Sequence, residues 1–88
     1  MPTGSREQEQ TLRTLGGVRS ALQEFRLATQ GAMAEHERLA GRYARQGDRA
    51  AAWMERRAAA VQRQRLADVD AALDSLEAAV SAALDLDS

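Results

Sequence analysis

The single histidine is the residue of this chain best suited to chemistry, because imidazole can act as a base or as a metal ligand. His36 lies between Glu35 and Glu37. A carboxylate–histidine metal site on helices needs a glutamate three residues before the histidine, and Met33 occupies that position. We therefore expect no metal site and no cofactor. His36 is interpreted as a polar residue of a helix interface that fixes register or oligomeric state.

Other reactive groups are equally sparse. The chain has no cysteine, which excludes disulfides and thiol chemistry. The serines have no base close to them in sequence apart from the single histidine, so no nucleophilic dyad is indicated. Gly16 and Gly17 lack the flanking strand and the remaining residues of a phosphate-binding loop. The sequence predicts that this protein is not an enzyme.

Charge is distributed unevenly, although the net charge is only −1. Residues 31–65 hold eight arginines against four carboxylates, whereas residues 66–88 hold six carboxylates and no basic residue. The arginines and aromatic residues around Gly47 form a candidate partner-binding set: Arg42, Tyr43, Arg45, Arg49, Trp53, Arg56 and Arg57. Such a set can bind an acidic protein surface or nucleic-acid phosphates. A solvated helix face, with the two aromatics closing the end of the fold, is the alternative.

Composition indicates an all-α chain with a thin core. Apolar residues make up 44% of the 88 residues, but nineteen of them are alanine, none is isoleucine and only three are aromatic. The only proline is Pro2, and the dominant residue types favour helix. Because so few large apolar side chains are present, we expect self-association or a partner protein. The low net charge and few aromatics favour a protein partner over nucleic acid.

The first arm of the expected fold begins where Ser5 and Gln8 can form a capping box. From residue 15, apolar spacing alternates between three and four residues, which is typical of one long amphipathic helix. The positions are Leu15, Val18, Leu22, Phe25, Thr29, Ala32, His36, Leu39 and Tyr43. We expect a disordered segment over residues 1–4 and a helix over residues 5–45.

A turn is expected over residues 46–48, because Gly47 can adopt the left-handed conformation that ends a helix and Asp48 can cap the next helix. The second helix is expected over residues 48–85. Its apolar positions are Met54, Ala58, Val61, Leu66, Val69, Leu73, Leu76, Val80 and Ala83 or Leu84. The five-residue step from Val61 to Leu66 predicts a local shift of the apolar stripe.

Folding the chain back at Gly47 places large apolar residues opposite one another. The expected facing pairs are Leu39 with Met54 or Glu55, Phe25 with Val69, Leu22 with Leu73, Val18 with Leu76 and Leu15 with Val80. This match predicts one helical domain over residues 1–88, a long antiparallel hairpin. Two helices leave part of each stripe exposed, so we expect a homodimeric four-helix bundle or coiled coil, or a complex with another helical protein.

Gly16 and Gly17 are the one feature that opposes a continuous first arm, at a cost of about 2 kcal/mol relative to alanine. Close approach of a neighbouring helix would explain such a pair within a continuous or bent arm. A true break, which leaves a short leading helix over residues 5–15, is the alternative. The continuous arm is favoured because the heptad phase carries across both glycines.

The plan of 88 residues in a helical hairpin with Trp53 near the turn resembles the WXG-type family of secreted hairpins. Met54 and Glu55 follow the tryptophan, so the W-x-G motif itself is absent, as is that family's C-terminal Y-x-x-x-D/E signal. The plan is also similar to that of the small hairpin co-chaperones of type III secretion needle subunits. Both resemblances rest on size and topology and imply pairing with another helical protein.

The sequence therefore predicts a non-catalytic helical interaction protein: an adaptor, a small chaperone, or a structural or secretion-type subunit. The alternative is a small regulatory or nucleic-acid-associated protein that binds through the arginines near Gly47. Neither a signal peptide nor an apolar run of roughly 20 residues is visible, so we expect a cytoplasmic protein, with leaderless secretion left open. The absence of lysine and asparagine suggests a GC-rich bacterial genome.

Overall fold

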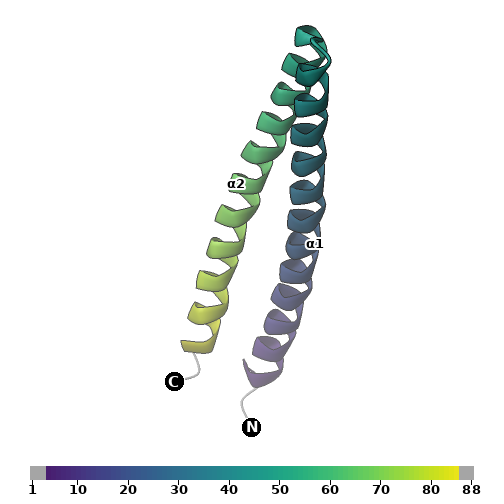
Figure 1. The fold of residues 1–88 in the computed structure, drawn as a ribbon. Helices are drawn as coiled ribbons and strands as arrows, with labels where there is room; N and C mark the ends of the chain where they lie inside the picture. The colour runs from purple at the N-terminus through teal and green to yellow at the C-terminus, as the bar shows by residue number, and fades with distance from the viewer. Residues whose placement is uncertain (1–3, 86–88) are drawn as a thin grey trace.

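The structure, a computed structural model, describes residues 4–85 as two long helices joined by a short turn (Figure 1). Helix α1 spans Gly4–Arg45 and helix α2 spans Arg49–Asp85, so that 96% of the described residues are helical. The helices run antiparallel, with the turn at one end and both chain ends at the other. The prediction of an all-α antiparallel hairpin is confirmed. Neither described helix has an apolar stretch long enough to cross a membrane.

The N-terminal boundary differs slightly from the expected one. Gly4 is already helical, so the segment expected to be disordered over residues 1–4 does not include it. Residues 1–3 lie outside the described residues, and so does the Ser5 side chain on which the expected capping box depends. Helix α1 continues without interruption through Gly16 and Gly17, so there is no separate leading helix in the described chain.

The turn is held by the hydrogen bonds expected from its sequence. Gly47 adopts a φ of 77°, in the left-handed region. The N–H of Gly47 donates to the carbonyl of Ala44 at 3.1 Å, and that of Asp48 donates to the carbonyl of Tyr43 at 3.0 Å. These two bonds define a Schellman motif. Asp48 also caps α2, because its Oδ1 accepts a hydrogen bond from the N–H of Ala51 at 3.1 Å.

The face that α2 turns toward α1 follows a single uninterrupted heptad pattern. Its buried and half-buried positions are Ala52, Glu55, Ala59, Gln62, Leu66, Val69, Leu73, Leu76, Val80 and Ala83. The predicted shift after Val61 is wrong, because Met54 and Val61 are 66% and 51% exposed and point away from α1. The short turn fixes the rotation of α2 about its own axis. The residues at the inward heptad positions therefore face α1 even where they are small or polar.

The face of α1 is also rotated relative to the expected stripe. Seven of the nine predicted positions are buried or half-buried: Leu15, Leu22, Thr29, Ala32, His36, Leu39 and Tyr43. Val18 and Phe25 lie instead at the edge of the interface and are 45% and 49% exposed. Arg26 is more buried than Phe25, and Ala40 more than Leu39. One edge of the apolar stripe of α1 is therefore left without a partner inside the hairpin.

The expected register can be checked in the middle of the hairpin and near the turn. Phe25 and Val69 line the same shallow depression, as predicted for a facing pair. Of the two residues expected opposite Leu39, Met54 lies on the outer face of α2, whereas Glu55 is half-buried in the interface. Toward the chain ends the two ribbons separate in Figure 1. Helices approach more closely where alanines meet than where leucines meet, which accounts for the narrow end at the turn.

Candidate functional site

The candidate site is the basic end of the hairpin, residues 42–57, which we call the tip. The predicted partner-binding residues all lie there: Arg42, Tyr43, Arg45, Arg49, Trp53, Arg56 and Arg57. All of them except Tyr43 are exposed. Tyr43 is half-buried, and its carbonyl accepts hydrogen bonds from the turn, so this residue supports the turn. The other six remain available to a partner.

Trp53 stands on the outer face of α2 rather than closing the end of the hairpin. Its side chain is 55% exposed, and the guanidinium carbon of Arg57 lies 5.1 Å from the ring centroid, a cation–π geometry. Met54 and Val61 are exposed on the same face. We call Trp53, Met54, Arg57 and Val61 the tip patch. Met54, Arg57 and Val61 follow Trp53 by one, four and eight residues, which places all four on one helix face. This spacing is the feature by which the sequence alone could have identified the tip patch.

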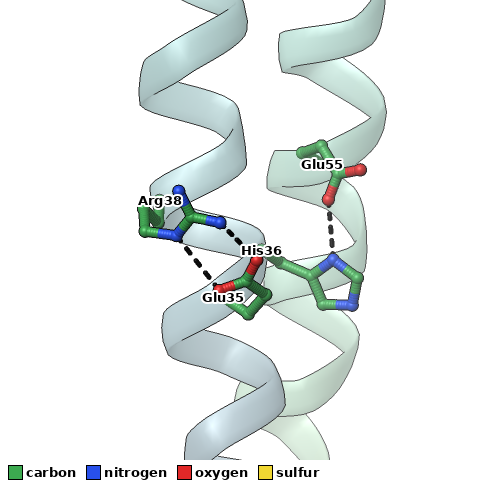
Figure 2. A network of polar contacts seen from close by, with 4 residues as sticks. All are labelled: Glu35, His36, Arg38 and Glu55. Carbon is green, nitrogen blue, oxygen red and sulfur yellow. Dashed lines mark hydrogen bonds and ion pairs between the residues drawn. The ribbon is translucent and has the colours of Figure 1, made fainter.

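Both carboxylates of the tip are engaged within the hairpin. Asp48 caps α2, as described above. Glu55 Oε2 accepts a hydrogen bond from His36 Nδ1 at 2.6 Å across the helix interface (Figure 2). Because a carboxylate can only accept, Nδ1 carries the proton in this contact. His36 thus lies in the interface, as predicted, and Glu55 is turned away from the arginines.

Among the described residues, the tip arginines have no acidic partner. Within the described chain, no ion pair is formed by Arg42, Arg45, Arg49, Arg56 or Arg57. Their positive charge is therefore not neutralised by the hairpin itself. An arginine cluster of this kind attracts an acidic surface over a distance of about one Debye length, roughly 8–10 Å at physiological salt.

A surface ion pair lies beside the His36 contact on α1. Arg38 donates two hydrogen bonds to the carboxylate of Glu35, one turn earlier on the same helix (Figure 2). The hydrogen bond from Arg38 holds the pKa of Glu35 below its ordinary value, and the same contact raises the pKa of Arg38. Both side chains are more than half exposed, so this pair contributes little to stability.

The described residues include no group of three or more histidine, cysteine or acidic side chains that could hold a metal ion. The groups that the tip exposes are guanidinium groups, an indole and a thioether. Comparisons with protein-family models, with curated proteins and with solved structures return no match. The likeness to secreted hairpins and to needle-subunit co-chaperones stays one of size and topology.

Proposed function

We propose that the protein is a non-catalytic helical interaction protein that works through helix–helix contacts with a second copy or with another helical protein. Adaptors, small chaperones and structural or secretion-type subunits act in this way. The observation that carries the proposal is the surface left open by the hairpin. The accessible surface is 6567 Å², whereas a compact monomer of 9.6 kDa exposes roughly 5,100 Å². The excess is larger than the roughly 800 Å² that one partner contributes to a standard interface.

The core supports the same conclusion. The buried residues in the described chain are Thr29, Ala40, Ala52, Ala59, Val69 and Leu76. Four of these six have small side chains, and no large side chain is fully buried. A hairpin with so little buried apolar area gains stability when further helices cover its stripes.

The tip supplies the chemistry for recognising an acidic helical protein. Its arginines form no ion pair within the described residues, and the tip patch adds an exposed tryptophan and methionine to them. Tryptophan, methionine and arginine are enriched in protein–protein interfaces, and tryptophan and arginine dominate their binding energy. We place the partner's acidic residues against Arg49 and Arg57, with an apolar side chain against Trp53.

A fluorescently labelled acidic amphipathic helical peptide is the probe for this proposal. We expect the peptide to bind and to shift the emission of Trp53, the only tryptophan of the chain. The double variant Arg49→Glu with Arg57→Glu should weaken binding at least tenfold at low salt, because steering and contact are both lost. The matched control, Arg6→Glu with Arg13→Glu, changes the net charge equally at the opposite end of the hairpin and should bind as the unmodified chain does.

Stability separates a binding effect from unfolding. Arg49 and Arg57 are exposed, so their replacement should cost less than about 1 kcal/mol in the free energy of unfolding. Equal weakening by both double variants would mean that only net charge matters and would contradict a tip site. Duplex DNA that binds more tightly than the peptide, with the same dependence on Arg49 and Arg57, would favour the nucleic-acid alternative.

A further inference from the structure

The two long flanks of the hairpin, where α1 and α2 lie side by side, differ sharply in polarity. On one flank three ion pairs cross between the helices: Arg19 with Glu77 at 3.7 Å, Arg26 with Asp70 at 2.6 Å, and Glu37 with Arg63 at 3.0 Å. The α2 partners are seven residues apart, which places them on one side of the helix. Six charged side chains of this polar flank are therefore paired inside the hairpin.

The opposite flank is mainly apolar, and among the described residues no arginine–carboxylate pair joins the two helices there. It carries Val18, Phe25 and Ala32 of α1, and Ala58, Ala72 and Ala79 of α2. Phe25 is 49% exposed and lines a shallow depression together with Ala72, Arg65 and Asp68. Arg65 and Asp68 are the charged groups on the rim of this depression. An apolar strip that runs along a rod-shaped hairpin matches the length of another helical hairpin.

The distribution of charge along α2 indicates what binds the apolar flank. Residues 49–65 hold five arginines and one carboxylate, whereas residues 66–85 hold five carboxylates and no basic residue. A second copy that packs with its own tip at the opposite end lays the basic half of α2 against the acidic half of its partner. A copy with both tips at the same end would place like charges together, which costs affinity.

We propose that the apolar flank binds a second copy of this chain in antiparallel orientation, with the twofold axis beside Phe25. Phe25 lies at the midpoint of α1, so this axis lets both hairpins overlap along their full length. Val18 of one copy then faces Ala32 of the other, a large side chain against a small one. Arg65 of one copy approaches the other copy's Asp68. Trp53 and Arg57 of the tip patch lie on the outer face of α2, away from the apolar flank, and stay open at both ends of the four-helix bundle.

Polar substitution at the proposed axis tests the surface. Sedimentation equilibrium of the unmodified chain should give a dimer, twice 9.6 kDa, at micromolar concentration. Phe25→Glu places two like charges at the axis and should weaken dimerisation by roughly a hundredfold or more, with helix content retained. The matched control is Leu27→Glu, since Leu27 is 68% exposed and lies by the polar flank with Arg26 and Asp70. This control should stay dimeric.

Orientation is tested with a single spin label, because the chain has no cysteine of its own. Gln46→Cys labels the exposed turn, 21 residues of α1 from Phe25. The antiparallel dimer should then give a label-to-label distance of about 60 Å, and a parallel dimer roughly 10–25 Å. A short distance, a monomer at all concentrations, or equal dissociation by Phe25→Glu and Leu27→Glu would each overturn the arrangement.

This inference rests on the proposed function only in that both use helix–helix contact, and their failures can be told apart. A monomeric chain that still binds the acidic helical peptide through Arg49 and Arg57 would overturn the dimer and leave the proposed function standing. A dimer with no affinity for the peptide would overturn the proposed function and leave the dimer standing.

Discussion

The hairpin can be divided into a tip half, residues 29–65, and an open half, residues 4–28 and 66–85. The two halves pack their helices together with side chains of different size. In the tip half, Ala40, Ala52 and Ala59 are 5%, 1% and 3% exposed. In the open half the side chains are larger, yet Val18 and Phe25 are about half exposed. Two helices alone can enclose a methyl group between them. They cannot enclose a ring or an isopropyl group at the edge of the interface, which needs a further helix.

This comparison corrects an expectation from the sequence. Large apolar residues concentrate in the open half, so the sequence predicts that this half is the better packed one. Burial is instead more complete near the turn, where the helices are held close together and the inward residues are small. The large side chains of the open half offer more apolar surface for burial than those of the tip half. In the isolated hairpin, part of that apolar surface stays exposed to water.

The largest expected effect of a core substitution is in the open half. Leu76 is 8% exposed and is the largest buried side chain in the described chain. Leu76→Ala should lower the free energy of unfolding by about 2–4 kcal/mol through lost transfer energy and a cavity. Urea denaturation followed by circular dichroism measures this change. A loss no greater than that caused by Val61→Ala, on the exposed outer face, would mean that the open half is not packed as described.

The tip half should be sensitive in the opposite direction, to added volume. Ala52 is 1% exposed, so Ala52→Leu forces the helices apart beside the turn and should cost about 1–3 kcal/mol. Ala60→Leu makes the same chemical change on the exposed face of the same helix and serves as the matched control. Thermal unfolding should give a lower melting temperature for Ala52→Leu alone. Equal melting temperatures for the two variants would contradict close packing at the tip.

The glycines of the open half should be replaceable with a gain in stability. A Cβ at Gly16 or Gly17 would meet nothing within 4 Å, so close helix approach inside the hairpin does not explain this pair. Gly16→Ala and Gly17→Ala should each raise the free energy of unfolding by about 0.5–1 kcal/mol. Gly47→Ala should lower it by about 1–2 kcal/mol, because the φ of 77° is unfavourable for alanine. Urea denaturation of the three variants measures these changes in the free energy of unfolding. A loss of stability in Gly16→Ala or Gly17→Ala, or a gain in Gly47→Ala, would contradict the prediction.

The smallest expected effect belongs to the surface pair Glu35–Arg38 in the tip half. Because the hydrogen bond from Arg38 lowers the pKa of Glu35 in the folded state, this pair stabilises the fold at neutral pH. That contribution disappears as the pH falls through the lowered pKa, when the carboxylate becomes protonated. Glu35→Gln should therefore shift the urea midpoint slightly at pH 7 and less at pH 3. A larger shift at pH 3 would contradict the direction of the pKa change.

Local features of the sequence determined the hairpin. Alternating three- and four-residue spacing, the absence of proline after Pro2 and the residues Gly47 and Asp48 act over one or two helical turns. They therefore predict two helices, their turn and its capping without knowledge of distant contacts. The charge difference between the tip and the C-terminal end was likewise readable from the sequence. Of the candidate site, the sequence identified the arginines and Trp53.

Tertiary structure alone decided which faces turn inward. Hydrophobicity predicts Met54 and Val61 in the interface and Phe25 at its centre, whereas the fold places the first two outside and the third at the edge. The rotation of each helix is set jointly by the turn and by the distance at which the two backbones pack. A residue's own hydrophobicity does not fix that rotation, and only the paired helices show which apolar side chains remain for a partner.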